Sequence, residues 1–152
     1  MEYTKRRNLN RGYMKLDVWQ RGMDLFDMTF QMAHRVADFK LKSQLTDSAQ
    51  SVSANVAEGY GRRSLPEYLQ FLYNAKGSMA EALTRASGLW RAGLFTEAEF
   101  NQFDQLHYEV ENKLLALISS LEAKRNTGQW VTTLPTYLAR QPTQQSINPT
   151  IQ

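Results

Sequence analysis

The chain has 152 residues, of which 42% are hydrophobic, and these values suit one globular domain with an ordinary core. It contains no cysteine, which excludes disulfides and thiolate metal sites and fits a reducing cytoplasm. The N-terminal residues lack the apolar stretch of a secretory signal, and the longest nearly apolar run covers only residues 114–121. We therefore expect a soluble cytoplasmic protein with no membrane partner.

The net charge of +3 is distributed unevenly along the chain. Residues 1–15 carry five basic side chains against Glu2, or +4, whereas residues 16–125 carry −2 and residues 126–152 carry +1. Because these first residues have little apolar content, we expect residues 1–15 to form a basic, flexible arm. The candidate phosphate-binding residues are its five cations, Lys5, Arg6, Arg7, Arg11 and Lys15.

Helical periodicity begins at Asp17, which with Gln20 fits a capping box. The first predicted helix runs to Phe39 or Lys40, and the second begins between Ser43 and Thr46 and is ended by Gly59 and Gly61. The expected buried stripe of the first helix contains Val18, Trp19, Leu25, Phe26, Thr29, Met32, Ala33, Val36 and Ala37. That of the second contains Leu45, Ala49, Val52, Val56 and Tyr60.

Two further helices are predicted, each opened by a capping box, Ser64 with Glu67 and Thr96 with Glu99. Gly93 should close the third helix. The third helix should bury Tyr68, Leu72, Ala75, Met79, Ala82, Ala86 and Leu89, and the fourth Phe100, Phe103, Leu106, Val110, Leu114, Leu117 and Leu121. Short connections between long helices force antiparallel neighbours. The sequence therefore predicts an all-α protein, an up-down-up-down four-helix bundle over residues 16–125.

Residues 126–152 differ from the bundle in composition, since Thr, Gln, Pro and Asn dominate and Arg140 is the one charged residue. We expect this tail to be largely disordered. Its apolar residues could nevertheless dock on the bundle or on a neighbouring molecule; they are Trp130, Val131, Leu134, Tyr137 and Leu138.

Unusual polar residues and glycines gather around the turn between the second and third helices. They are Asn55, Glu58, Gly59, Arg62, Arg63, Gly77, Ser78 and Glu81. One interpretation makes them a polar pocket; the other has them hydrogen-bond to the turn and the third helix and fix the register of the bundle. We favour the second. Gly77 lies in the middle of a helix, which predicts a close helix contact within the bundle or between subunits.

A di-iron site in a four-helix bundle needs paired Glu-x-x-His motifs and further carboxylates. The two histidines are His34 and His107, and only His107 has an acidic residue three positions before it, Asp104. No serine lies in a recognisable nucleophile elbow. We therefore expect no metal, no cofactor and no enzymatic activity.

The central residues resemble a known protein family. The resemblance rests on Val18-Trp19-Gln20, on residues 51–59 (Ser-Val-Ser-Ala-Asn-Val-Ala-Glu-Gly), and on Arg62 or Arg63, Ser64, Glu67, Tyr68, Gly77, Ser78 and Glu81. This pattern, over about residues 16–121, is similar to that of the four-helix-bundle proteins encoded inside intervening sequences of bacterial large-subunit ribosomal RNA genes. Where many members carry arginines, this chain has Thr46-Asp47-Ser48.

The resemblance implies a homo-oligomeric bundle, typically a ring-shaped pentamer, with no established enzymatic activity. Related accessory proteins of diversity-generating retroelements are basic and are thought to bind nucleic acid. From these implications we expect a homo-oligomeric scaffold or interaction protein. The alternative is an accessory protein that binds RNA or single-stranded DNA through the basic arm.

Overall fold

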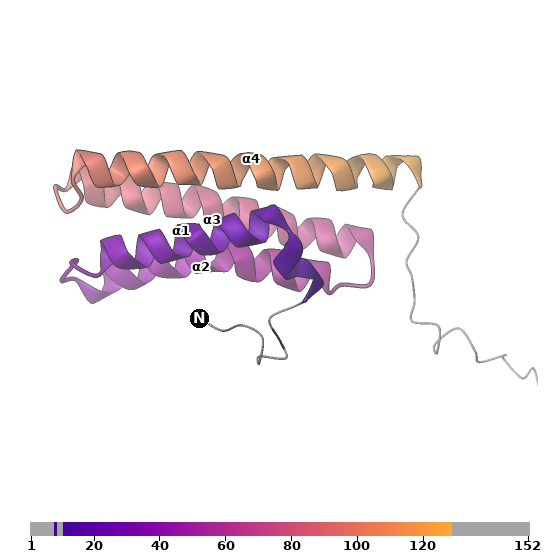
Figure 1. Cartoon of the computed structure of the whole chain (residues 1–152), viewed down its shortest axis with the longest axis horizontal. Coiled ribbons are helices and arrows are strands. Elements are labelled where there is room, and N and C mark those ends of the chain that lie inside the picture. The colour runs from indigo at the N-terminus through magenta and orange to yellow at the C-terminus, as the bar shows by residue number, and fades with distance from the viewer. Residues whose placement is uncertain (1–7, 9–10, 129–152) are drawn as a thin grey trace, which may run out of the picture.

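Four antiparallel helices form the bundle in the computed structural model, which describes residue 8 and residues 11–128 (Figure 1). A short 3-10 helix, η2 (Gly12–Lys15), precedes α1 (Asp17–Ala33), α2 (Phe39–Tyr60), α3 (Leu65–Arg91) and α4 (Glu97–Thr127). Each helix packs on the next, and α1 also packs on α4, which closes the bundle. The predicted all-α four-helix fold is confirmed.

The core consists of the residues that recur every three or four positions. All seven predicted positions of α3 are buried. In α4 the prediction missed two buried residues, Ile118 and His107, while Phe100 and Leu117 are only half-buried. Each fully buried large apolar side chain stabilises the fold by about 1.5–3 kcal/mol relative to its exposed state.

The predicted boundary between the first two helices is wrong. α1 ends at Ala33, and α2 begins at Phe39 because the Asp38 side chain accepts a hydrogen bond from the Leu41 amide at 2.9 Å. Asp38 therefore starts a helix where the periodicity alone indicated the end of one. As a result Phe39 belongs to the first turn of α2 and is 80% exposed.

Of the other three predicted helix starts, those of α3 and α4 are confirmed. Thr96 and Glu99 form a complete capping box, and the Ser64 side chain accepts a hydrogen bond from the Glu67 amide. Asp17, however, is the first residue of α1 rather than its cap, and the Gln20 side chain donates to the Met14 carbonyl instead. The predicted capping box at this end is therefore wrong.

Both ends of the bundle differ from the predicted domain limits. Residues 12–15, assigned to the arm, form η2 and pack on α1 and α2. α4 continues to Thr127, past the predicted end at residue 125, and Gly128 follows with a φ of +66°. The predicted flexibility of the rest of the arm and disorder of the tail concern residues 1–7, 9–10 and 129–152, which lie outside the described residues.

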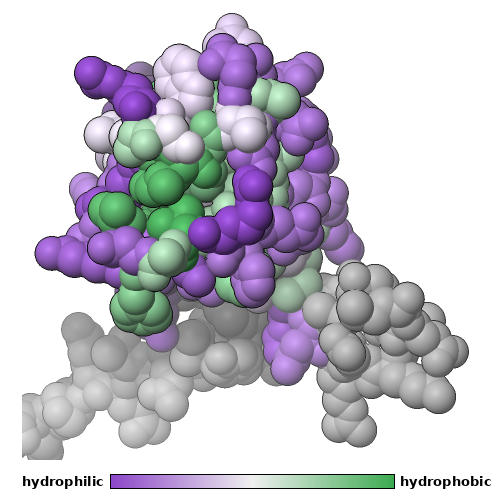
Figure 2. Space-filling view, turned by 90° about the vertical axis from the view of Figure 1, so that its left-hand side faces the viewer, coloured by the Kyte–Doolittle hydropathy of each residue, from purple (hydrophilic) through white to green (hydrophobic). Residues whose placement is uncertain are grey.

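The two ends of the bundle have different surfaces. The α1–α2 and α3–α4 connections lie at one end, and Figure 2 shows hydrophobic side chains gathered there. Three exposed ones belong to these connections or to the first turn of α2, namely Phe39, Leu41 and Leu94. The opposite end holds η2, the α2–α3 connection and the end of α4 (Figure 1). Over the described part of the chain, no helix has the length and apolar content to cross a membrane.

Candidate functional site

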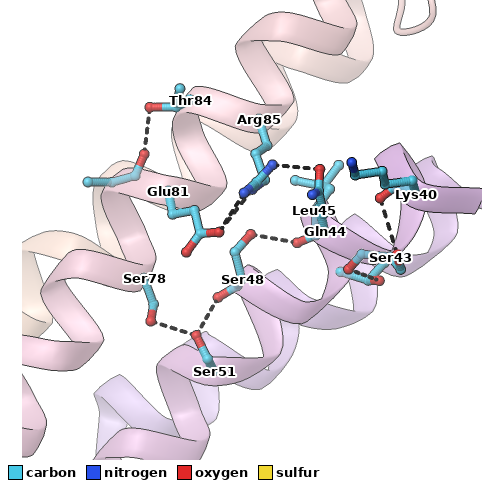
Figure 3. Close-up of polar contacts among 12 residues, drawn as sticks. Lys40, Ser43, Gln44, Leu45, Ser48, Ser51, Ser78, Glu81, Thr84 and Arg85 are labelled. Carbon is cyan, nitrogen blue, oxygen red and sulfur yellow. Dashed lines mark hydrogen bonds and ion pairs between the residues drawn. The ribbon is translucent and has the colours of Figure 1, made fainter.

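The unusual polar residues lie along the seam between α2 and α3. At its middle the Oγ atoms of Ser51 and Ser78 are 2.5 Å apart (Figure 3). Ser51 also reaches the Ser48 carbonyl at 3.0 Å, and Ser78 donates to the Asn74 carbonyl at 3.1 Å. These contacts satisfy both hydroxyls and hold one helix in register against the other.

Arg85 links α2 and α3 near the N-terminal end of α2 and the C-terminal end of α3. Its guanidinium pairs with Glu81 on the same helix at 2.9 Å and donates to the Gln44 side chain on α2 at 2.8 Å (Figure 3). Glu81 is thus neutralised by a cation one turn away. These contacts join the two helices, and both of them use the Arg85 guanidinium.

A second polar group lies at the other end of the seam. The Asn55 side chain donates to the Ser51 carbonyl at 2.8 Å, and Glu58 pairs with Arg62 at 2.6 Å. The Arg62 guanidinium also lies over the Phe71 ring of α3, 4.5 Å from the ring centre. Arg63, the other predicted member, is exposed. Within the described residues Asn55 bonds inside α2, Glu58 pairs with Arg62 of the α2–α3 connection, and Arg62 contacts α3. The structural interpretation of these residues stays a prediction.

The two motif glycines differ from their predicted roles. α2 ends at Tyr60 with Gly61 as its C-cap, as predicted, but Gly59 lies inside the last turn and is buried. A Cβ atom at Gly59 would lie 2.8 Å from the Cβ of Phe71 and 3.2 Å from the Tyr68 carbonyl. The close approach of α2 and α3 therefore occurs at Gly59. At Gly77 a Cβ atom would meet nothing within 4 Å, so the predicted close contact within the bundle is wrong. A contact of Gly77 with another subunit stays a prediction.

The histidines lie in different surroundings. His107 is buried, and its Nε2 atom lies 2.7 Å from the Met79 carbonyl, so the ring serves as a hydrogen-bonding core residue. His34 is exposed just after α1. Among the described residues, no group of three or more His, Asp or Glu side chains is placed to hold a metal ion.

Two of the five arm cations belong to the described structure, Arg11 and Lys15, which lie at or next to η2. The Tyr13 ring packs edge-on against Trp19 and Tyr60, at 5.7 and 6.3 Å between ring centres, and anchors this short helix. The structure therefore brings Arg11 and Lys15 to the end of the bundle that holds Arg62 and Arg63 (Figure 1). Lys5, Arg6 and Arg7 lie outside the described residues.

An apolar surface on α1 was missed at the sequence level. Trp19 and Phe26, predicted to be buried, are only half-buried, and they alternate with Met23 and Phe30, which are 36% and 54% exposed. We call these four residues the α1 stripe. The signal was present in the sequence, because an apolar series at positions 19, 23, 26 and 30 runs beside the buried series at positions 18, 22, 25 and 29. Met23 and Phe30 face outward, whereas Trp19 packs partly against the core and against Tyr13.

Comparison with known proteins identifies the family. The family model described as "23S rRNA-intervening sequence protein" matches residues 14–116. The chain belongs to this family. The matched residues cover most of the bundle and include every motif residue of the α2–α3 seam. Comparison with curated proteins finds no match.

One similar solved structure supports the fold of this family member. It is a protein of unknown function from the S23 ribosomal protein family of Bacteroides thetaiotaomicron. The two chains superpose with a TM-score of 0.62 at 17% sequence identity, over 66% of this chain and 97% of the other. At this identity the likeness establishes a shared bundle and nothing about activity.

Proposed function

We propose that this protein is a non-enzymatic scaffold that assembles into a homo-oligomeric ring, a pentamer being the expected form, through the α1 stripe. The observation that carries this proposal is the exposure of Met23 and Phe30 between Trp19 and Phe26 on one helix. Methionine and aromatic side chains are enriched in the centres of protein interfaces. Apolar side chains that are grouped on a surface, as in this stripe of four, mark a site that another protein covers.

The neighbouring helix continues this apolar surface. The Ser53 hydroxyl donates to the Trp19 carbonyl at 3.1 Å, so α2 lies directly beside the stripe. Ala57, one turn beyond Ser53, is half-buried, and Ala54 is exposed. Small side chains next to large ones allow a partner helix to approach closely.

A second copy of this chain is the partner that the charges favour. Residues 16–125 carry a net charge of only −2, so two bundles repel each other weakly. A ring also requires that the stripe meet a different surface on the neighbouring copy, because self-pairing of one surface gives a closed dimer. Membership of the family adds the expectation of such rings.

The test is to introduce a charge into the stripe. Phe30→Glu should convert the oligomer to smaller species in light scattering while the helical circular dichroism is retained, because Phe30 is 54% exposed in the single chain. Tyr108→Glu is the matched control, since Tyr108 is an exposed aromatic residue on α4. Unchanged size in the Phe30 variant would exclude the stripe as the contact surface.

A second candidate function is binding of RNA or single-stranded DNA. The observation that favours it is the anchoring of η2, whose Tyr13 ring packs on Tyr60 and which carries Lys15, with Arg11 directly before it. Cations attract the phosphate backbone, and exposed aromatic rings stack on bases. Lys5, Arg6 and Arg7 extend the same basic stretch.

Salt dependence tests this second candidate. Each phosphate contact contributes about 0.7 to the slope of log affinity against log salt for single strands, so replacing all five arm cations by Gln should reduce the slope by up to roughly 3.5. The matched control replaces Lys40 and Lys42, which lie on α2 at the opposite end of the bundle. An equal effect of both variants, or none, would contradict binding through the arm.

A further inference from the structure

An apolar groove lies between α2 and α3 near the end of the bundle seen in Figure 2. It has a volume of about 380 Å³, which falls in the range of roughly 300–1,000 Å³ typical of binding sites. Its lining residues are Leu41, Gln44, Thr84, Arg85, Gly88, Leu89 and Ala92. Gly88 supplies no side chain, and a Cβ atom there would meet nothing within 4 Å. The groove is therefore open along the surface of α3.

The surroundings of the groove are hydrophobic and exposed. Leu41 forms one wall and is 42% exposed, and Phe39, two residues earlier, is 80% exposed. The one charged lining residue, Arg85, is paired with Glu81 and bonded to Gln44. A neutral, apolar chain segment suits such a groove better than an acidic peptide or a phosphate.

We propose that the apolar segment Trp130–Leu138 of a second copy of this chain docks in this groove. The segment carries five large apolar side chains, Trp130, Val131, Leu134, Tyr137 and Leu138, and no charged residue. It matches the groove in polarity. The proposal rests on the self-association proposed above and names a second contact between neighbouring copies.

Geometry excludes docking of the segment on its own groove. His107 lies beside Met79, and Trp90 bonds to Glu97, so Gly88 on α3 is level with Glu99 on α4. From Glu99 to Gly128 the helix rises by roughly 44 Å at about 1.5 Å per residue. A fully extended chain from Gly128 places Leu138, ten residues on, at most about 36 Å away, and Trp130 about 7 Å away. Even at full extension Leu138 falls about 8 Å short of the level of Gly88, and the other four side chains fall shorter still. The five side chains therefore cannot fill the groove of their own chain, and they must come from another molecule.

The consequence is a head-to-tail arrangement. α4 ends at the opposite end of the bundle from the groove, so each copy would give its segment at one end and receive another at the other (Figure 1). Contacts between two different surfaces generate rings when the rotation closes. The docked segment thus supplies a second contact of this kind, beside the contact proposed for the α1 stripe.

Site-directed cross-linking tests the docking in the full-length protein. Because the chain has no cysteine, single introduced cysteines react uniquely. Gly88→Cys protein is mixed with Leu138→Cys protein and treated with a short bismaleimide. We expect a cross-linked pair of the two chains. Asn112→Cys is the control: Asn112 is exposed on α4, which does not line the groove, and it should cross-link at least tenfold less.

Light scattering on the same samples separates the two proposals. If the protein is an oligomer but the Gly88 cysteine cross-links no more than the control cysteine, the docking is overturned and self-association stands. A monomer without cross-links would remove both. In a Gly88→Cys, Leu138→Cys double variant at high dilution, a cross-link between the two cysteines of one chain would contradict docking between copies.

A second variant keeps the test independent of cross-linking chemistry. Gly88→Arg fills the groove with a charged side chain and replaces a helical glycine with a better helix former, so the fold is retained. For this test the groove cysteine is placed at another lining position, as Thr84→Cys. Its cross-link to Leu138→Cys protein should be at least tenfold weaker when Gly88→Arg is also present. Asn112→Arg should retain it, and equal retention by both variants would overturn the proposal.

Discussion

At the scale of single residues, the contact at Gly59 decides how closely α2 and α3 pack. The atoms that a side chain would meet there include the Tyr68 carbonyl, which is backbone and cannot rotate away. The motif glycine is therefore required by helix proximity rather than by a turn. Its neighbours Phe71 and Tyr68 complete the contact.

Gly59→Ala should lower the free energy of unfolding by about 1–3 kcal/mol, because the added methyl group displaces α3. The control is Gly77→Ala, where the methyl group meets open space and the gain in helix propensity should stabilise the protein by up to about 1 kcal/mol. Urea denaturation of the two variants measures both values. Similar stabilities for the two alanine variants would contradict this assignment.

The comparison of these glycines shows what the sequence can and cannot predict about single residues. Both glycines were singled out from the sequence, Gly77 because glycine is costly inside a helix and Gly59 as part of the signal that ends α2. Which of them lies at the helix crossing depends on the relative register of α2 and α3. That register is set by pairs such as Ser51 with Ser78, 27 positions apart, and no local pattern encodes it.

At the scale of the elements, caps and interhelical pairs position the four helices. All seven positions of α3 that the periodicity of apolar residues predicted are buried, and Leu65 and Leu69 are buried as well, since that helix is covered on several sides. It failed at the α1–α2 connection, where apolar residues continue at helical spacing through Val36 and Ala37. The Asp38 side chain caps α2, and this cap is the local signal of the helix boundary that the apolar periodicity does not contain.

Asp38→Ala should lower the free energy of unfolding by about 1 kcal/mol, since the Leu41 amide loses its acceptor. Asp38→Asn should be close to neutral, because asparagine caps helices equally well. Chemical denaturation of both variants is the measurement. If the two substitutions cost the same, the cap is not the source of the stabilisation.

Arg21 joins α1 to α4 through Glu109, with Nη2 and Oε2 2.7 Å apart, and also pairs with Asp24 at 2.6 Å. The hydrogen bond from Arg21 lowers the pKa of Glu109 below its ordinary value of about 4.5. A carboxyl group with a lowered pKa in the folded state stabilises the protein above its unfolded pKa, and this contribution is lost as the pH falls through the folded pKa. Both side chains are partly exposed, so the effect is small.

Glu109→Gln should therefore be less stable than the wild type at neutral pH and should approach it in acid. Thermal unfolding over a series of pH values from neutral to below 4.5 measures the difference. Asp104→Asn, which removes an exposed carboxylate from the same helix, is the control. A constant difference between Glu109→Gln and the wild type at all pH values would contradict the role of this pair.

At the scale of the whole molecule, the bundle carries surfaces that one chain does not use. The α1 stripe and the groove beside Gly88 are both apolar, and they lie on different parts of the molecule. Which apolar series of α1 faces outward follows only from the packing of α1 against α2 and α4, so the sequence alone did not assign this surface. A self-assembling bundle gives both surfaces a partner.

The most direct measurement is the absolute mass of the full-length protein in solution by light scattering over a dilution series. The chain has a mass of 17.5 kDa. We predict a single species at a fixed multiple of that mass at tens of micromolar, with five copies expected for the ring, and its dissociation in the Phe30→Glu variant. A monodisperse species of 17.5 kDa at these concentrations would contradict the central claim.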